Sequence, residues 1–146
     1  MYVADSKRLT QQGAKMIMTT AVDLATQAGI AISCAIVDAG GHVILLERMD
    51  GGRFHTVHSC TTKAVCAASN RRPTTTKGAA GQDLDVGHTL GLALAAGPDR
   101  WTAMEGGVPV LVDGQCLGGV GVSGGDWETD VRIAKASVEA IGASWT

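Results

Sequence analysis

Residues 108–122 read VPVLVDGQCLGGVGV, a sequence with the pattern of a β-hairpin. Two apolar runs, 108–112 and 116–122, are joined through Asp113-Gly114, a dipeptide whose residues adopt the positive φ angles of a tight hairpin turn. A turn of this length cannot form the long crossover that parallel strands need. The stretch therefore predicts two adjacent antiparallel strands.

A second strand pair is predicted nearer the N-terminus. The runs 32–37 (ISCAIV) and 42–47 (HVILLE) flank Asp38-Ala39-Gly40-Gly41, whose residue types suit a tight reversal with positive φ. Two hairpins of this kind indicate an antiparallel sheet.

Helical periodicity appears on either side of these hairpins. Apolar and small residues recur every three or four positions over Leu9–Ala28 and over 56–70, where Arg71-Arg72-Pro73 ends the pattern. A third helix is expected from Trp127 to about Ile141, after the N-cap residue Asp126. The signal around 83–94 is weaker and predicts a short helix among loops. The element order predicts an α/β (α+β) fold in which helices flank the sheet.

Length and charge limit the class of protein. A chain of 146 residues has the size of one domain, spanning 1–146. The 12 Lys and Arg residues against 14 Asp and Glu leave a net charge of -2, which does not suit a nucleic-acid partner. No basic start leads into an apolar segment, and no run of about 18 apolar residues follows. A cytoplasmic protein without membrane spans is expected.

Composition also bears on assembly and on the cysteines. Gly is frequent, with 20 residues, and aromatic residues are few, so each residue buries little apolar area and oligomerisation is a natural source of stability. The four cysteines, Cys34, Cys60, Cys66 and Cys116, form no C-x-x-C pair and suit reduced core thiols.

Two glycine-rich segments are candidate binding loops. Glu105-Gly106-Gly107 precedes a strand, where it suits either a cradle for an anion or carbonyl group or a simple turn. Ser123-Gly124-Gly125 leads into the last helix, whose N-terminus attracts anions. Asp130 lies one turn beyond Asp126, and both carboxylates also suit a structural role at the helix start.

Charged and imidazole side chains cluster around the second helix. Arg48 and Asp50 follow the second strand, where Arg48 suits either a carboxylate ligand or an ion pair with Asp50 or Glu47. His55 and His58 are three residues apart, so both imidazoles can approach one metal ion or a haem, or remain on a solvated helix face. Lys63, five residues beyond His58, lies on a different face. No Walker loop, G-x-S-x-G, H-E-x-x-H or C-x-x-C-H motif is present.

Five segments in order resemble the GlcG/HbpS-like family, also called the haem-degrading domain family and related to the PduO C-terminal domain. They are VDAGGH at 37–42, RMDG at 48–51, TKA at 62–64 with RPT at 72–74, EGGVPV at 105–110 and GVGVSG at 119–124. This resemblance implies a profilin-like sandwich with a five-stranded antiparallel sheet. It also implies homo-oligomers from dimers to octamers.

The resemblance leaves three functions open. The first is a pocket for a small organic anion or haem, formed by the 105–107 loop, the start of the last helix and the second helix; a metal ion is a further candidate cofactor. The second is a catabolic enzyme that moves a proton, with Lys63 or His58 as base and Glu105 or Asp130 as acid. The third is an accessory subunit without chemistry.

Overall fold

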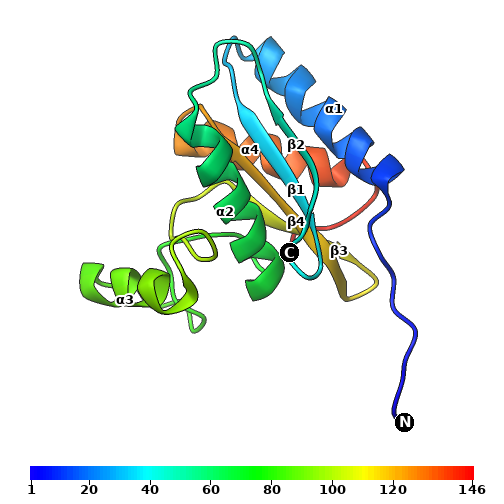
Figure 1. Cartoon of the computed structure of the whole chain (residues 1–146), viewed down its shortest axis with the longest axis vertical. Helices are drawn as coiled ribbons and strands as arrows, with labels where there is room; N and C mark the ends of the chain where they lie inside the picture. Colours follow the sequence, from blue (N-terminus) through cyan, green and yellow to red (C-terminus); the bar gives the residue numbers. More distant parts are fainter.

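The computed structural model describes residues 1–146 and contains four helices and four strands. In chain order they are α1 (Gln11–Gln27), β1 (Ser33–Asp38), β2 (Val43–Arg48), α2 (His55–Asn70), α3 (Val86–Ala96), β3 (Gly107–Val112), β4 (Gln115–Ser123) and α4 (Trp127–Glu139). The strands form one sheet in the order β2-β1-β4-β3, and all neighbours are antiparallel (Figure 1). The predicted α+β class and antiparallel sheet are confirmed.

The prediction of five strands is wrong, because the sheet has four. The C-terminal segment reaches the free edge of β3 but pairs with it at one position, where Ser144 and Leu111 exchange two backbone hydrogen bonds of 2.8 Å. The next residue, Trp145, donates its indole N–H to the Glu139 carboxylate at 2.8 Å, which ties the chain to the end of α4. With pairing at this single position, the segment forms an isolated bridge and not a fifth strand.

Both predicted hairpin turns are present. Asp113 and Gly114 have φ values of 49° and 74°, the paired positive angles of a type I′ turn. In the first hairpin one Asp38 carboxylate oxygen accepts hydrogen bonds from the backbone N–H groups of Gly40 and His42, at 2.9 and 3.0 Å. Each hairpin is therefore fixed by residues within its own turn.

Local signals also set the helix ends. Thr10 caps α1 by accepting from the Gly13 N–H at 3.0 Å, and Asp126 caps α4, as predicted, by accepting from Thr129 at 2.8 Å. Helix α2 ends at Arg71, which has a left-handed φ of 57°. The weak signal around 83–94 corresponds to α3, which begins after the N-cap Asp85.

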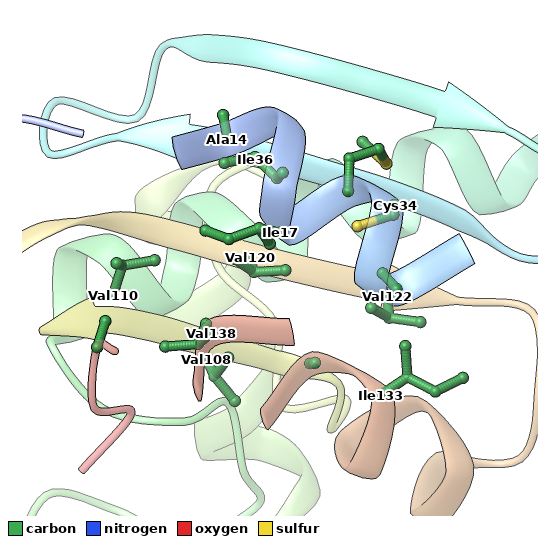
Figure 2. Close-up of a cluster of buried hydrophobic side chains, with 14 of the residues drawn as sticks. Ala14, Ile17, Cys34, Ile36, Val108, Val110, Val120, Val122, Ile133 and Val138 are labelled. Carbon is green, nitrogen blue, oxygen red and sulfur yellow. The ribbon is translucent and has the colours of Figure 1, made fainter. Parts of the chain in front are cut away.

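The sheet is covered on both faces. Helices α1 and α4 bury the larger core on one face, where Ile17, Ile36, Val120, Val122 and Ile133 meet (Figure 2). Helix α2 covers the other face through a smaller cluster of mostly small residues: Ala35, Val37, Cys60, Ala64 and Ala68. The alternation along β1, with Ile36 on one face and Val37 on the other, is the period of a strand buried on both sides.

Helix α2 lies directly on the backbone of β4. A Cβ atom on Gly121 would overlap the carbonyl oxygen of Cys60, and one on Gly119 would overlap that of Ala64. The lack of a side chain at these strand positions therefore permits the close approach. It brings the first half of α2 beside the end of β4 and the start of α4.

All four cysteines are free, and burial raises the pKa of Cys60 to about 11, so its thiol stays protonated at neutral pH. Each helix is too short or too polar to cross a lipid bilayer.

Candidate functional site

Two adjoining cavities lie beside the first half of α2. The larger, of about 650 Å³, is mostly apolar and lies between α2, α3 and the 98–105 segment. Its wall comprises His55, His58, Ser59, Thr62, Thr76, Thr89, Leu90, Ala93, Pro98, Trp101, Thr102, Ala103, Met104 and Glu105. The smaller cavity, of about 370 Å³, lies between α2 and the start of α4. Because His55, Ser59, Met104 and Glu105 line both, the two cavities form one candidate site.

The smaller cavity is the more polar one. It brings together five residues that were predicted as site residues from separate parts of the chain, Lys63, Glu105, Ser123, Gly124 and Asp130. The other residues of its wall are Arg53, His55, Thr56, Ser59, Met104, Gly125 and Trp127. Helix α2 supplies Thr56, Ser59 and Lys63 to this wall. Their spacing of three and four residues places them on one face of the helix.

A buried ion pair forms part of this wall. The Lys63 ammonium lies 3.4 Å from an Asp130 carboxylate oxygen and donates to the Val122 carbonyl at 2.8 Å. The other Asp130 oxygen accepts from the Gly125 N–H at 2.9 Å. The two side chains are only 6% and 5% exposed. The pair therefore connects α2, the end of β4 and α4.

Burial dominates the electrostatics of this pair. It lowers the pKa of Lys63 from its ordinary value, although the Asp130 carboxylate acts in the opposite direction. Burial likewise raises the pKa of Asp130, against the effect of the Lys63 ammonium. Both pKa shifts favour the uncharged forms of Lys63 and Asp130. Each side chain therefore depends on its oppositely charged partner to remain ionised.

Hydroxyl groups complete the polar wall. The Ser59 hydroxyl donates to that of Ser123 at 2.9 Å and links α2 to the end of β4. The hydroxyl oxygens of Thr56 and Ser33 lie 2.8 Å apart, and the Thr56 hydroxyl donates to the Arg53 carbonyl at 2.6 Å. These contacts hold the first turn of α2 against the sheet, although Phe54 provides no side-chain cap for the helix.

The two glycines at 106 and 107 do not line either cavity. Gly106 and Gly107 are buried, and a Cβ on Gly106 would lie 2.9 Å from the Lys63 ammonium nitrogen. The Gly107 N–H donates to the Thr74 hydroxyl at 2.9 Å. Close packing against the Val122 carbonyl of β4 accounts for Gly106, and close packing against the Lys63 backbone of α2 accounts for Gly107, without a ligand. Glu105, one residue earlier, is the member of this segment that reaches the cavity walls.

Arg48 and Asp50 lie apart from both cavities. Both side chains are exposed, and Arg48 forms no ion pair with Asp50 or Glu47. Its aliphatic stem instead covers Gly52. Their proposed contact with a ligand stays a prediction. Arg53, which the sequence analysis did not select, provides a cation at the smaller cavity.

The two histidines are brought to one wall. His55 and His58 are exposed and both line the larger cavity, whereas Lys63 lines only the smaller one. No group of three or more His, Cys, Asp and Glu residues is arranged to hold a metal ion. Both imidazoles therefore belong to the wall of the larger cavity, and their proposed role as metal or haem ligands stays a prediction.

Some wall residues carried no signal in the sequence. Trp101 and Met104 come from an irregular segment, and Leu90 and Ala93 come from the weakly predicted α3. Ser59 was detectable, because it shares the helical stripe of Thr56 and Lys63.

Comparisons with known proteins agree with this architecture. The chain is 39% identical to Protein GlcG of Escherichia coli strain K12 over 115 residues, which are 79% of this chain and 81% of that protein. The crystal structure of Klebsiella pneumoniae protein ORFY is similar with a TM-score of 0.84 and 29% identity, over 97% of both chains. The PduOC:haem complex is similar with a TM-score of 0.81 and 26% identity, over 95% of this chain and 99% of that one.

The family comparison covers nearly the whole chain. The model described as "Haem degrading protein HbpS-like" matches residues 9–139, which include every strand and helix of the fold. Together with the GlcG relative, this match identifies the chain as a member of the HbpS-like family.

Proposed function

We propose that this chain binds haem, or an organic anion with a similarly flat apolar body, in the larger cavity. The observation that carries the proposal is a mostly apolar cavity of about 650 Å³ with two imidazoles, those of His55 and His58, in its wall. Sites for small molecules and cofactors usually have volumes of roughly 300–1,000 Å³, apolar walls and few polar groups.

The residues of the cavity fit haem chemically. Leu90, Ala93 and Trp101 offer apolar contacts to a flat ring, and imidazole nitrogen and thioether sulfur, as in Met104, are common ligands of haem iron. Bound haem would supply a redox-active iron. The solved haem complex of the structurally similar PduOC supports this choice of ligand.

The carboxylates of such a ligand need a cation. No Lys or Arg lines the larger cavity, and Lys63 in the smaller one is already paired with Asp130. Arg53 lines the smaller cavity and forms no ion pair. Arg100 lines a further cavity of about 550 Å³, which shares only His58 and Thr62 with the larger one, whereas Arg53 shares the smaller cavity with Ser123 and Gly124. Because backbone and hydroxyl donors accompany Arg53, we place the carboxylates there, with the apolar body in the larger cavity.

Titration with haemin tests the proposal directly. Purified protein is expected to shift and sharpen the Soret band. His58→Ala or His55→Ala, whichever removes the iron ligand, should weaken the affinity by about tenfold or more, equivalent to ~1.4 kcal/mol. The measurement is a visible titration at fixed ionic strength.

His42→Ala is the matched control for this titration. Its imidazole is also exposed, but it lies 3.2 Å from the Asp38 carboxylate at the first hairpin turn and lines neither cavity. The control should bind haemin like the wild-type protein. An unchanged haemin spectrum with wild-type protein would refute haem as the ligand.

The position of the carboxylates gives a second prediction. Arg53→Gln is expected to weaken haemin binding by about tenfold, because it removes a charge-assisted hydrogen bond. The effect should largely disappear with haemin dimethyl ester, which has no free carboxylate. Affinities measured by fluorescence quenching of the three tryptophans would show both results.

Arg48→Gln tests the other arginine that was predicted to bind a carboxylate; Arg48 is also exposed but lies outside both cavities, so this variant should bind haemin like the wild-type protein. If Arg48→Gln weakened haemin binding and Arg53→Gln did not, the proposed position of the carboxylates beside Arg53 would be wrong.

A further inference from the structure

A third cavity, of about 550 Å³, lies between β2, α2 and the Asp99–Arg100 segment. Its wall comprises Gly40, Gly41, Val43, Leu46, Val57, His58, Thr61, Thr62, Val65, Asp99 and Arg100. Only His58 and Thr62 also line the larger cavity of the candidate site, and none of these residues lines the smaller one. The proposed function therefore leaves most of this wall unused.

The edge of the sheet supplies part of the apolar wall. Leu46 and Val43 of β2 pair with Ala35 and Val37 of β1, so all four side chains extend from the face of the sheet that α2 covers. Helix α2 packs on β1 and β4 and does not bury the edge strand, where Val43 and Leu46 stay 51% and 40% exposed. Two large apolar side chains on a core-facing side of the sheet are thus left beside the helix.

Helix α2 and the first hairpin turn close the cavity. Val57, Thr61 and Val65 recur at steps of four, which places them on one face of α2, and all three are half-buried. A Cβ atom on Gly41 would lie 3.5 Å from a Val65 methyl group, so the turn approaches the helix there. The enclosed volume lies within the roughly 300–1,000 Å³ that is usual for small-molecule sites.

Opposite charges meet at the same wall. Asp99 and Arg100 are both exposed, and neither forms an ion pair with the other or with any other residue. The Arg100 guanidinium donates only to the Ala96 carbonyl, at 3.4 Å, so most of its donors are free. The Thr61 hydroxyl donates to the Val57 carbonyl at 2.7 Å and keeps its oxygen as an acceptor.

These groups are complementary to a zwitterion with an apolar body. The α-carboxylate of an amino acid suits the planar fork of Arg100, and its α-ammonium suits the Asp99 carboxylate and the Thr61 oxygen. A ligand with a carboxylate alone would bring a like charge close to Asp99, and a simple amine would do the same at Arg100. We propose that the third cavity binds an α-amino acid with an apolar side chain, which lies against Val43 and Leu46. The proposal does not depend on haem binding.

Calorimetric titration with leucine and three fragments of it tests the class of ligand. Leucine is expected to bind at least about tenfold more tightly than glycine, which offers no side chain to the apolar wall. Isocaproate lacks the ammonium group of leucine, and isopentylamine lacks its carboxylate. Each should bind about tenfold or more weakly than leucine, because each leaves one charge of the protein without its partner.

Two charge variants test the assigned contacts. Arg100→Gln should weaken the binding of both leucine and isocaproate by about tenfold, because both ligands carry the carboxylate. Asp99→Asn should weaken the binding of leucine by a similar factor and should not weaken that of isocaproate, which has no ammonium group. Arg8→Gln and Asp5→Asn are the matched controls, since both residues are exposed and line none of the three cavities. They should bind leucine like the wild-type protein.

Several results would overturn the proposal. They are a wild-type protein that gives no heat with leucine, isocaproate that binds as tightly as leucine, and an equal loss of leucine and isocaproate binding in Asp99→Asn. Haemin titration of the same samples separates this site from the proposed function. A protein that binds leucine but no haemin would support the third cavity and reject only haem, and one that binds haemin but no leucine would reject only the amino-acid site.

Discussion

Gly121→Ala is expected to destabilise the protein by roughly 3 kcal/mol or more. The added methyl group would overlap the Cys60 carbonyl oxygen and would lie 2.7 Å from the Ala64 nitrogen. Both are backbone atoms of α2, so no side-chain rotation can relieve the overlap. The helix has to move away from the sheet, and the small core between them, which includes Ala35, Cys60 and Ala64, loses its packing.

Urea unfolding followed by circular dichroism measures this effect, and Gly13→Ala is its control. A Cβ at Gly13 would have the Leu9 methyl group as its nearest neighbour, at 3.2 Å, and this is the end of a flexible side chain. Gly13→Ala should therefore change the free energy of unfolding by less than about 1 kcal/mol, with any gain arising from helix propensity. Equal urea midpoints for Gly121→Ala and wild-type protein would disprove the close-packing argument.

The parts of the fold that could be predicted are those fixed by neighbouring residues. Asp113-Gly114 sets its turn through its own φ angles, and Asp126 caps α4 through an oxygen that reaches only three residues along. The number of strands, in contrast, is not fixed by neighbouring residues. It depends on contacts between distant segments, and the segment around Ser144 pairs with β3 at one position only.

Helix α3 was hard to predict for a physical reason. Its apolar residues occur on every side, so they produce no clear 3.6-residue period.

The candidate site was predictable where a charged side chain on a helix or a glycine-rich loop marks it. Lys63, Asp130, Ser123 and Glu105 were selected from separate segments and meet at one cavity. The direction of the chain after β2 could not be read from local residues. It places Arg53, and not Arg48, at that cavity. Gly106 and Gly107 could not be interpreted from the sequence alone, because two consecutive glycines suit close packing and a ligand cradle equally well.

Lys63→Met is expected to destabilise the protein by about 3–5 kcal/mol, because it leaves the Asp130 carboxylate buried without a cation. Methionine fills most of the space of the lysine stem, so packing is largely kept. Asp130 retains the Gly125 N–H as a hydrogen-bond donor, but that contact alone does not replace the ammonium. Lys15→Met, at an exposed position of α1, should change stability by less than about 0.5 kcal/mol.

The loss in Lys63→Met should grow as the pH rises. Burial already raises the pKa of Asp130 in the wild-type protein, and removal of the nearby ammonium raises it further. A carboxyl group whose folded-state pKa exceeds its unfolded value favours folding fully below the unfolded value, about 3.9, and loses that contribution as the pH passes through the folded value. The stability deficit of Lys63→Met against wild-type protein should therefore be larger at pH 8 than at pH 5, as measured by urea unfolding.

A double variant distinguishes loss of the charge partner from simple loss of packing. Asp130→Asn keeps an oxygen that can accept from the Gly125 N–H but removes the buried charge. Lys63→Met combined with Asp130→Asn should therefore be more stable at pH 8 than Lys63→Met alone, and its deficit should no longer depend on pH between 5 and 8. If the double variant is instead as unstable as the sum of the two single ones, the pair does not stabilise its own charges, and Lys63 acts at this site through its aliphatic stem.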